Sequence, residues 1–121
     1  MSLKSEAELY QPIKDFLEFE GYAVQGEVVG CDVVAVRGED ILVVEMKRQF
    51  NLKLVMQAIA RQQVCSSVYM AFPSTVQLSA RRRMSEIKAL AKRLHLGIIL
   101  VHDRPSGLTV EVLLTPDFKE F

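Results

Sequence analysis

The chain has 121 residues, enough for a single domain with its own core, and half of them are hydrophobic while a quarter are charged. This composition excludes a disordered or collagen-like protein. No apolar run approaches the roughly 18 residues that a membrane-spanning helix needs, and the N-terminus lacks the pattern of a signal peptide. Cys31 and Cys65 are too few for a disulfide framework and fit no zinc spacing, so we expect a cytoplasmic protein without membrane contact.

The net charge is zero, but the charges are unevenly distributed along the chain. Residues 1–46 contain three Lys or Arg and ten Asp or Glu, a balance of −7, whereas residues 47–104 contain eleven and two, a balance of +9. Residues 105–121 add one lysine and three acids. Such an asymmetry indicates a nucleic-acid partner, unless the two halves interleave in space and their charges cancel.

The N-terminal part predicts one helix followed by three strands. Ser5 and Glu8 have the spacing of a capping box, apolar residues recur behind them at the helical period, and Gly21 ends the helix. Turn residues and apolar runs then predict strands at Tyr22–Val29, Asp32–Val36 and Ile41–Lys47.

The rest of the chain predicts two helices and three strands. Asn51 is the N-cap of a helix that should bury Leu52, Val55, Met56 and Ile59 on one side. A longer helix at Ser79–His95 ends near Gly97. The remaining strands are expected at Val68–Phe72, Ile98–His102 and Leu108–Leu114. Helices between strands imply parallel neighbours and hairpins imply antiparallel ones, so we expect an α/β fold with a mixed sheet, in the order α-β-β-β-α-β-α-β-β.

The hairpin between Asp32 and Lys47 should bring charged side chains together at its open end. With a two-residue loop at Gly38-Glu39, Asp32 faces Glu45, and Lys47 follows on the same face one pleat further on. Facing carboxylates repel, so a cation must offset them. Either Lys47 does so in a structural ion-pair cluster, or a divalent metal does, and an all-oxygen site suits Mg²⁺ or Mn²⁺. A three-residue loop would move Asp32 off this face.

Two segments of this hairpin, Gly30-Cys31-Asp32-Val33-Val34 and Val44-Glu45-Met46-Lys47, resemble the motif of the PD-(D/E)xK phosphodiesterase superfamily. This is the fold of restriction endonucleases and archaeal Holliday-junction resolvases, and Cys31 stands where the motif has its proline. Together with the stretch Phe50–Ala58, the hairpin looks closest to an uncharacterised bacterial branch, the domain-of-unknown-function family 2161. The resemblance implies a restriction-endonuclease-like fold over the single domain 1–121.

The same resemblance implies the roles of the hairpin residues. Asp32 and Glu45 would bind the metal with help from the backbone carbonyl of Met46. Lys47 would orient or activate the attacking water and help to neutralise the transition state.

Further candidates lie outside the hairpin. By resemblance, Glu8 on the first helix reaches the metal and Gln57 on the next helix lies near the site; alternatively, Glu8 only completes the capping box and Gln57 is a polar surface residue. Arg81, Arg82 and Arg83 could contact phosphates or could be a solvated helix face. The two histidines, His95 and His102, are too far apart for a zinc site and are assigned structural or surface roles.

The resemblance implies a Mg²⁺- or Mn²⁺-dependent phosphodiesterase that hydrolyses DNA and leaves a 5′-phosphate. Two alternatives stay open: a non-catalytic nucleic-acid-binding or subunit-assembly module that retains the fold, and a plain structural domain with an ion-pair cluster. Sequence-specific protein–DNA interfaces bury about 1,000–2,500 Å² of protein. A domain this small has little area to spare, so we expect low-specificity or structure-specific DNA binding and a homodimer or a partner chain.

Overall fold

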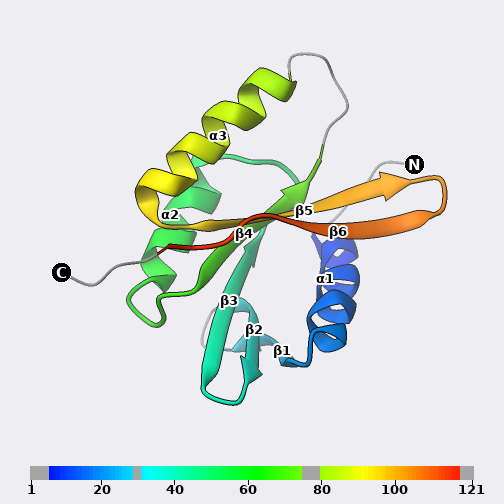
Figure 1. Ribbon diagram of the computed structural model, residues 1–121, viewed down its shortest axis with the longest axis vertical. Coiled ribbons are helices and arrows are strands. Elements are labelled where there is room, and N and C mark those ends of the chain that lie inside the picture. The colour runs from blue at the N-terminus through cyan, green and yellow to red at the C-terminus, as the bar shows by residue number, and fades with distance from the viewer. Residues whose placement is uncertain (1–5, 29–30, 75–79, 118–121) are drawn as a thin grey trace.

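Six strands form one mixed sheet with helices on both of its faces (Figure 1). The computed structural model describes residues 6–28, 31–74 and 80–117, without the side chains of residues 27, 28, 31, 80 and 81. Within these ranges the elements are α1 (Ala7–Phe19), β1 (Ala23–Val28), β2 (Cys31–Arg37), β3 (Asp40–Met46), α2 (Leu52–Arg61), β4 (Val68–Pro73), α3 (Ala80–Leu94), β5 (Gly97–Arg104) and β6 (Gly107–Leu114). The predicted α/β fold and its element order are therefore confirmed.

The strands lie in the sheet in their sequence order, from β1 to β6. β1, β2 and β3 form an antiparallel meander, β3, β4 and β5 are parallel, and β6 returns antiparallel to β5. The two parallel connections advance across the sheet in the same direction. Because such crossovers are right-handed, α2 and α3 must cover the same face of the sheet, which leaves the opposite face to α1.

Each face of the sheet has its own apolar core. On one face, Leu9, Ile13 and Leu17 of α1 recur at the helical period and pack on side chains such as Val44. On the other face, α2 and α3 pack on a cluster that includes Val43. Odd-numbered and even-numbered residues of β3 therefore face different helices, which decides where its charged residues point. No helix in the described ranges is long and apolar enough to cross a membrane.

The buried side of α2 differs from the predicted one. Leu54, Val55 and Ala58 are buried, whereas three residues that we expected in the core are exposed: Leu52 (70%), Met56 (61%) and Ile59 (40%). Both sets of residues have helical spacing, so the periodicity predicts the helix but not its rotation about its axis. The N-cap prediction is confirmed, because the Asn51 side chain accepts a hydrogen bond from the Leu54 N–H at 2.9 Å.

The helix ends show one confirmed and one wrong prediction. Gly21 adopts a φ of 95° and ends α1 as expected. At the end of α3, however, the left-handed residue is His95, with a φ of 60°. Gly97 instead starts β5, where a Cβ atom would come within 2.5 Å of the Tyr69 ring. It is needed for close packing rather than for helix termination. The predicted helix starts at Ser5 and Ser79 lie outside the described residues.

Candidate functional site

The β2–β3 hairpin has the predicted register. Arg37 pairs with Asp40 across a two-residue turn in which Gly38 has a φ of 62°, and the paired residues continue to Val33 and Val44. The next pair, Asp32 and Glu45, is joined through side chains. The Asp32 N–H donates to Glu45 Oε2 at 3.0 Å, and the Met46 N–H donates to Asp32 Oδ2 at 2.8 Å. Each carboxylate is thus held by the backbone of the other strand.

Glu45 points into the protein beneath α2. It lies two residues after Val43 on the same face of β3, and it is only 1% exposed. Arg61, at the end of α2, places its Nε 3.6 Å from Glu45 Oε2. Sequence reasoning missed Arg61, although a signal was present: it follows Leu54 and Ala58 at helical spacing, so a cation falls on the buried side of the helix.

Lys47 lies directly after β3 and next to the start of α1. Its N–H donates to the Ala71 carbonyl at 3.1 Å, and its Nζ lies 3.4 Å from Glu6 Oε1. The structure therefore brings Glu6 to the cluster of charged residues formed by Asp32, Glu45, Lys47 and Arg61. Glu8, the predicted acid, lines a hollow between α1 and β6. Ser5 of the predicted capping box lies outside the described residues, and the side chain of Glu6, directly before α1, makes no cap hydrogen bond.

Gln57 lies one turn before Arg61 on the same side of α2. Its Oε1 atom is buried and accepts no hydrogen bond from any described residue. A buried acceptor without a donor costs about 1–3 kcal/mol. A cation or a water molecule would satisfy this oxygen.

Burial raises the pKa values of both carboxyl groups. For Asp32, the desolvation together with repulsion from Glu6 outweighs the hydrogen bond from Met46 and the attraction of Lys47 and Arg61, so its pKa lies above the ordinary 3.8. For Glu45, the desolvation together with the neighbouring Asp32 charge outweighs the Asp32 N–H and Arg61, so its pKa lies above 4.5. The cations of the cluster therefore do not fully offset the cost of holding two carboxylates there.

The donor set fits Mg²⁺ or Mn²⁺ better than zinc. In the ranges that the structure describes, no group of three or more His, Cys, Asp or Glu side chains is placed to hold a metal. Asp32 and Glu45 supply two neighbouring carboxylates at the open end of the hairpin, and the orphaned oxygen of Gln57 belongs to α2, which covers the same face of the sheet. Mg²⁺ is typically bound by one or two carboxylates and keeps several waters, which two acids can satisfy.

A hollow of about 300 Å³ lies beside Lys47. It lies at the N-terminus of α2, whose first turn contains no acidic residue. The residues lining it are Glu6, Lys47, Arg48, Gln49, Asn51 and Lys53. Three cations and one carboxylate give this surface a positive balance, which suits a phosphate group.

The predicted arginines lie near the start of α3. Arg82 and Arg83 are exposed, and Arg82 Nε lies 3.7 Å from Glu86 Oε1. The side chain of Arg81 is outside the described part of the chain. α3 begins at the end of the sheet toward which β4 and β5 point (Figure 1), and it lies on the same face as Glu45.

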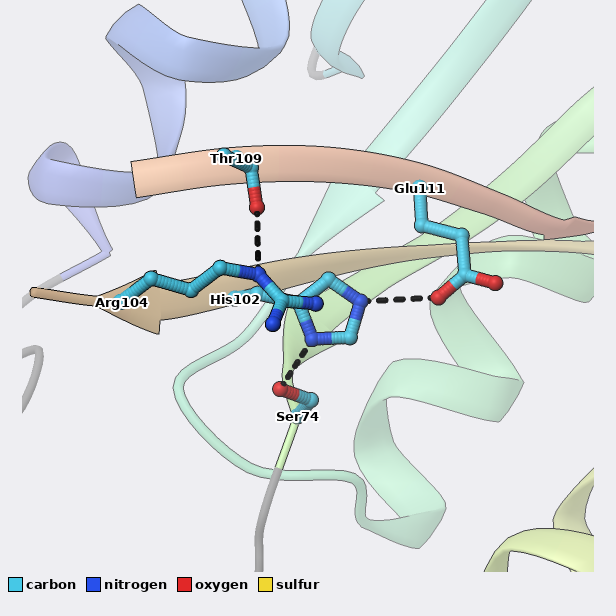
Figure 2. A network of polar contacts seen from close by, with 5 residues as sticks. All are labelled: Ser74, His102, Arg104, Thr109 and Glu111. Carbon is cyan, nitrogen blue, oxygen red and sulfur yellow. Dashed lines mark hydrogen bonds and ion pairs between the residues drawn. The ribbon is translucent and has the colours of Figure 1, made fainter. Parts of the chain in front are cut away.

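A second polar network occupies the ends of β4, β5 and β6 (Figure 2). Ser74 Oγ lies 2.7 Å from His102 Nδ1, and His102 Nε2 lies 2.8 Å from Glu111 Oε1. Arg104 Nε donates to Thr109 Oγ1 at 3.2 Å. Sequence reasoning missed this network because the predicted strands, Ile98–His102 and Leu108–Leu114, leave residues 103–107 outside the sheet. The observed strands pair up to Arg104 and Gly107, which brings the side chains of both strands together.

Comparisons with known proteins give a likeness in structure only. No family model matches the sequence, and no curated protein matches it. Among solved structures, the chain is similar to SfsA of Pyrococcus furiosus in complex with Ca²⁺, with a TM-score of 0.47 and 13% sequence identity. The match covers 95% of this chain, which spans 64% of the SfsA chain.

Proposed function

We propose that the protein is a metal-dependent phosphodiesterase of the PD-(D/E)xK type that hydrolyses DNA. The observation that supports this proposal best is the pair of cross-bonded carboxylates, Asp32 and Glu45, with the Lys47 ammonium at the end of the same strand. Two acids with raised pKa values next to a cation, at the end of a sheet, are typical of a functional site. Two carboxylates that face each other on neighbouring strands destabilise a sheet, so selection for stability alone does not explain this pair.

Each residue of the cluster has a role in this proposal. Asp32, Glu45 and the Met46 carbonyl would hold Mg²⁺ or Mn²⁺, and the unsatisfied Gln57 Oε1 would accept a hydrogen bond from a water molecule of the site. The chemistry that such an ion supplies is polarisation of the scissile phosphate and a lower pKa for the attacking water. Lys47 orients that water and stabilises the negative charge that develops in the transition state. The hollow beside Lys47 receives the phosphate.

A non-catalytic nucleic-acid-binding module is the second candidate, and one observation favours it. Arg61 already places a positive charge on Glu45, so the folded protein has a counter-ion without a metal. In this module the basic surface would bind DNA, and Asp32 and Glu45 would only stabilise the hairpin. A homodimer or a partner chain stays a prediction for both candidates.

Cleavage of end-labelled DNA separates the two candidates. Single-stranded, duplex and branched substrates are incubated with the protein and Mn²⁺, and the products are tested for a 5′-phosphate. We expect cleavage by the native chain and none by Glu45→Gln prepared in the same way, which controls for contaminating nucleases. DNA binding without cleavage on any substrate would favour the non-catalytic module.

The arginines of α3 should contribute to DNA affinity by neutralising phosphates. Changing Arg81, Arg82 and Arg83 together to alanine should make the slope of log K against log [salt] shallower, by about 0.9 for each duplex phosphate that these side chains neutralise in the native chain. Mn²⁺ affinity should not change, because these arginines are not ligands. An unchanged slope would show that they form a solvated helix face.

A further inference from the structure

The network of Ser74 and His102 lies on the same face of the sheet as the candidate site. Phe72 and Leu100 belong to the core under α2 and α3. Ser74 and His102 each follow one of them by two residues, so they extend the same face. Glu45 faces α2 as well. The two polar groups are therefore neighbours along one surface rather than opposite sides of the molecule.

The strand pairing sets the spacing between the two groups. Met46 is level with Ala71 and Pro73 is level with Val101, so Ser74 lies two residues beyond the level of Lys47 on the next strand. At about 4.8 Å between strands and 3.3 Å per residue, the Cα of Ser74 lies about 8 Å, and that of His102 about 12 Å, from the Cα of Lys47. Successive phosphates of one DNA strand lie nearly twice as far apart as the roughly 3.4 Å rise along a duplex axis, so this distance corresponds to one or two nucleotides.

The network presents hydrogen-bond donors at an accessible position. The His102 side chain is 19% exposed, and Ser74 is half-buried. Because the Glu111 carboxylate only accepts, His102 Nε2 carries a proton, and the imidazole is held in one orientation against Ser74 Oγ. The Ser74 hydroxyl, whose oxygen is placed by the imidazole, is the group of this network that donates to a phosphate oxygen.

Arg104 adds a positive charge at the same place. Its Nε donates to Thr109, and Thr109 is the residue paired with His102 across β5 and β6. The guanidinium therefore lies back along the strand at the level of His102, as Figure 2 shows, with its two terminal nitrogens beyond the bond to Thr109. A planar guanidinium next to a hydroxyl is a common way to bind a phosphate oxygen.

We propose that Ser74, His102 and Arg104 form a second phosphate-binding point, which holds the DNA strand one or two nucleotides away from the phosphate at Lys47. The inference rests on the proposed function, because it assigns a second contact to the DNA strand that Lys47 binds on the same surface. Ser74 and Arg104 touch the phosphate. His102 is a positioning residue, which Glu111 orients and which in turn fixes the Ser74 hydroxyl.

A length series of oligothymidylates tests this point. Affinities of dT2, dT4, dT6 and dT8 are measured in EDTA, where no divalent ion permits cleavage. We expect Arg104→Gln to leave dT2 binding unchanged, because dT2 is too short to reach both points. For dT6 and dT8 the same variant should bind about tenfold more weakly, the size expected for one charge-assisted contact. Its salt slope should be shallower by about 0.7.

Matched variants separate a contact from a general effect of charge or stability. Lys14→Gln removes the same charge from α1, on the opposite face, and should leave the length dependence intact. Ser74→Ala should weaken dT6 but not dT2, Ser74→Thr should restore binding, and Ser85→Ala on the exposed side of α3 should have no effect.

Two results would overturn the inference alone: an equal loss for Lys14→Gln and Arg104→Gln, or a Ser74→Ala variant that melts earlier but binds dT6 as well as the native chain. Failure of the native chain to bind any of the oligonucleotides, or labelled duplex, would instead contradict the proposed function itself.

Discussion

Asp32→Asn should lower the affinity for Mn²⁺ by about a hundredfold or more while leaving the metal-free protein at least as stable as the native chain. The asparagine oxygen can still accept the hydrogen bond from the Met46 N–H, so β2 and β3 stay connected at this end of the hairpin. At the same time, the substitution removes one of two neighbouring like charges. Calorimetric titration with Mn²⁺ and urea unfolding in EDTA measure the two effects separately.

The pH dependence of stability provides an independent test of the same variant. The pKa values of Asp32 and Glu45 are raised by burial, so between the ordinary and the raised values the native state binds more protons than the unfolded state. Their contribution to stability is full below the ordinary values of about 4 and is lost as the pH rises through the raised values. Metal-free Asp32→Asn should therefore lose less stability than the native chain over that range.

Asp40→Asn is a suitable control, because Asp40 is an exposed carboxylate at the other end of the same hairpin, 4.0 Å from Arg37. It should change neither Mn²⁺ binding nor the pH profile. If Asp32→Asn strongly destabilises the metal-free protein while Asp40→Asn does not, the cluster is a structural ion-pair network and the proposal of a metal site is wrong.

Arg61→Met should destabilise the metal-free protein by about 2–3 kcal/mol, because it leaves the Glu45 carboxylate buried without its counter-ion. The loss is smaller than for a fully buried ion pair because a quarter of the Arg61 side chain is exposed to solvent. Glu45→Gln in the Arg61→Met background should recover most of the stability. Urea unfolding of the two single variants and the double variant in EDTA gives the coupling energy.

Mn²⁺ titration of Arg61→Met then shows how the arginine relates to the metal. We expect tighter Mn²⁺ binding than in the native chain, because a competing cation has been removed from Glu45. Lys53→Met, which removes an exposed cation from the same helix, should alter stability much less. An Arg61→Met protein as stable as the native chain would mean that Glu45 does not depend on this ion pair.

The hairpin could be predicted from the sequence because its rules are local. A two-residue turn at Gly38-Glu39 sets the register, and the register alone makes Asp32 face Glu45. The rotation of α2 is different, since Leu52, Met56 and Ile59 have the same spacing as the residues that are buried. Only the short connection from β3 and the contact with the sheet decide which set faces inward.

The contacts made by Glu6, Arg61 and Ser74 could not be predicted for a related reason. Each of them joins elements that are distant in the chain: the start of α1 with the end of β3, α2 with β3, and the end of β4 with β5. A sequence pattern shows that a polar residue lies on a given face, but the partner depends on how the helices sit on the sheet. Arg61 illustrates this, because its position on the buried side was visible while its partner was not.

The exchanged hydrogen bonds between Asp32 and Glu45 link ligand binding to the fraying of the hairpin. Beyond Val33 and Val44 the ladder is continued by carboxylate oxygens instead of main-chain carbonyls. Any cation that draws electron density from these oxygens also weakens the bonds that they accept from the Asp32 and Met46 amides. Protection of the Asp32 and Met46 amide protons against hydrogen exchange should therefore change with the occupancy of the site.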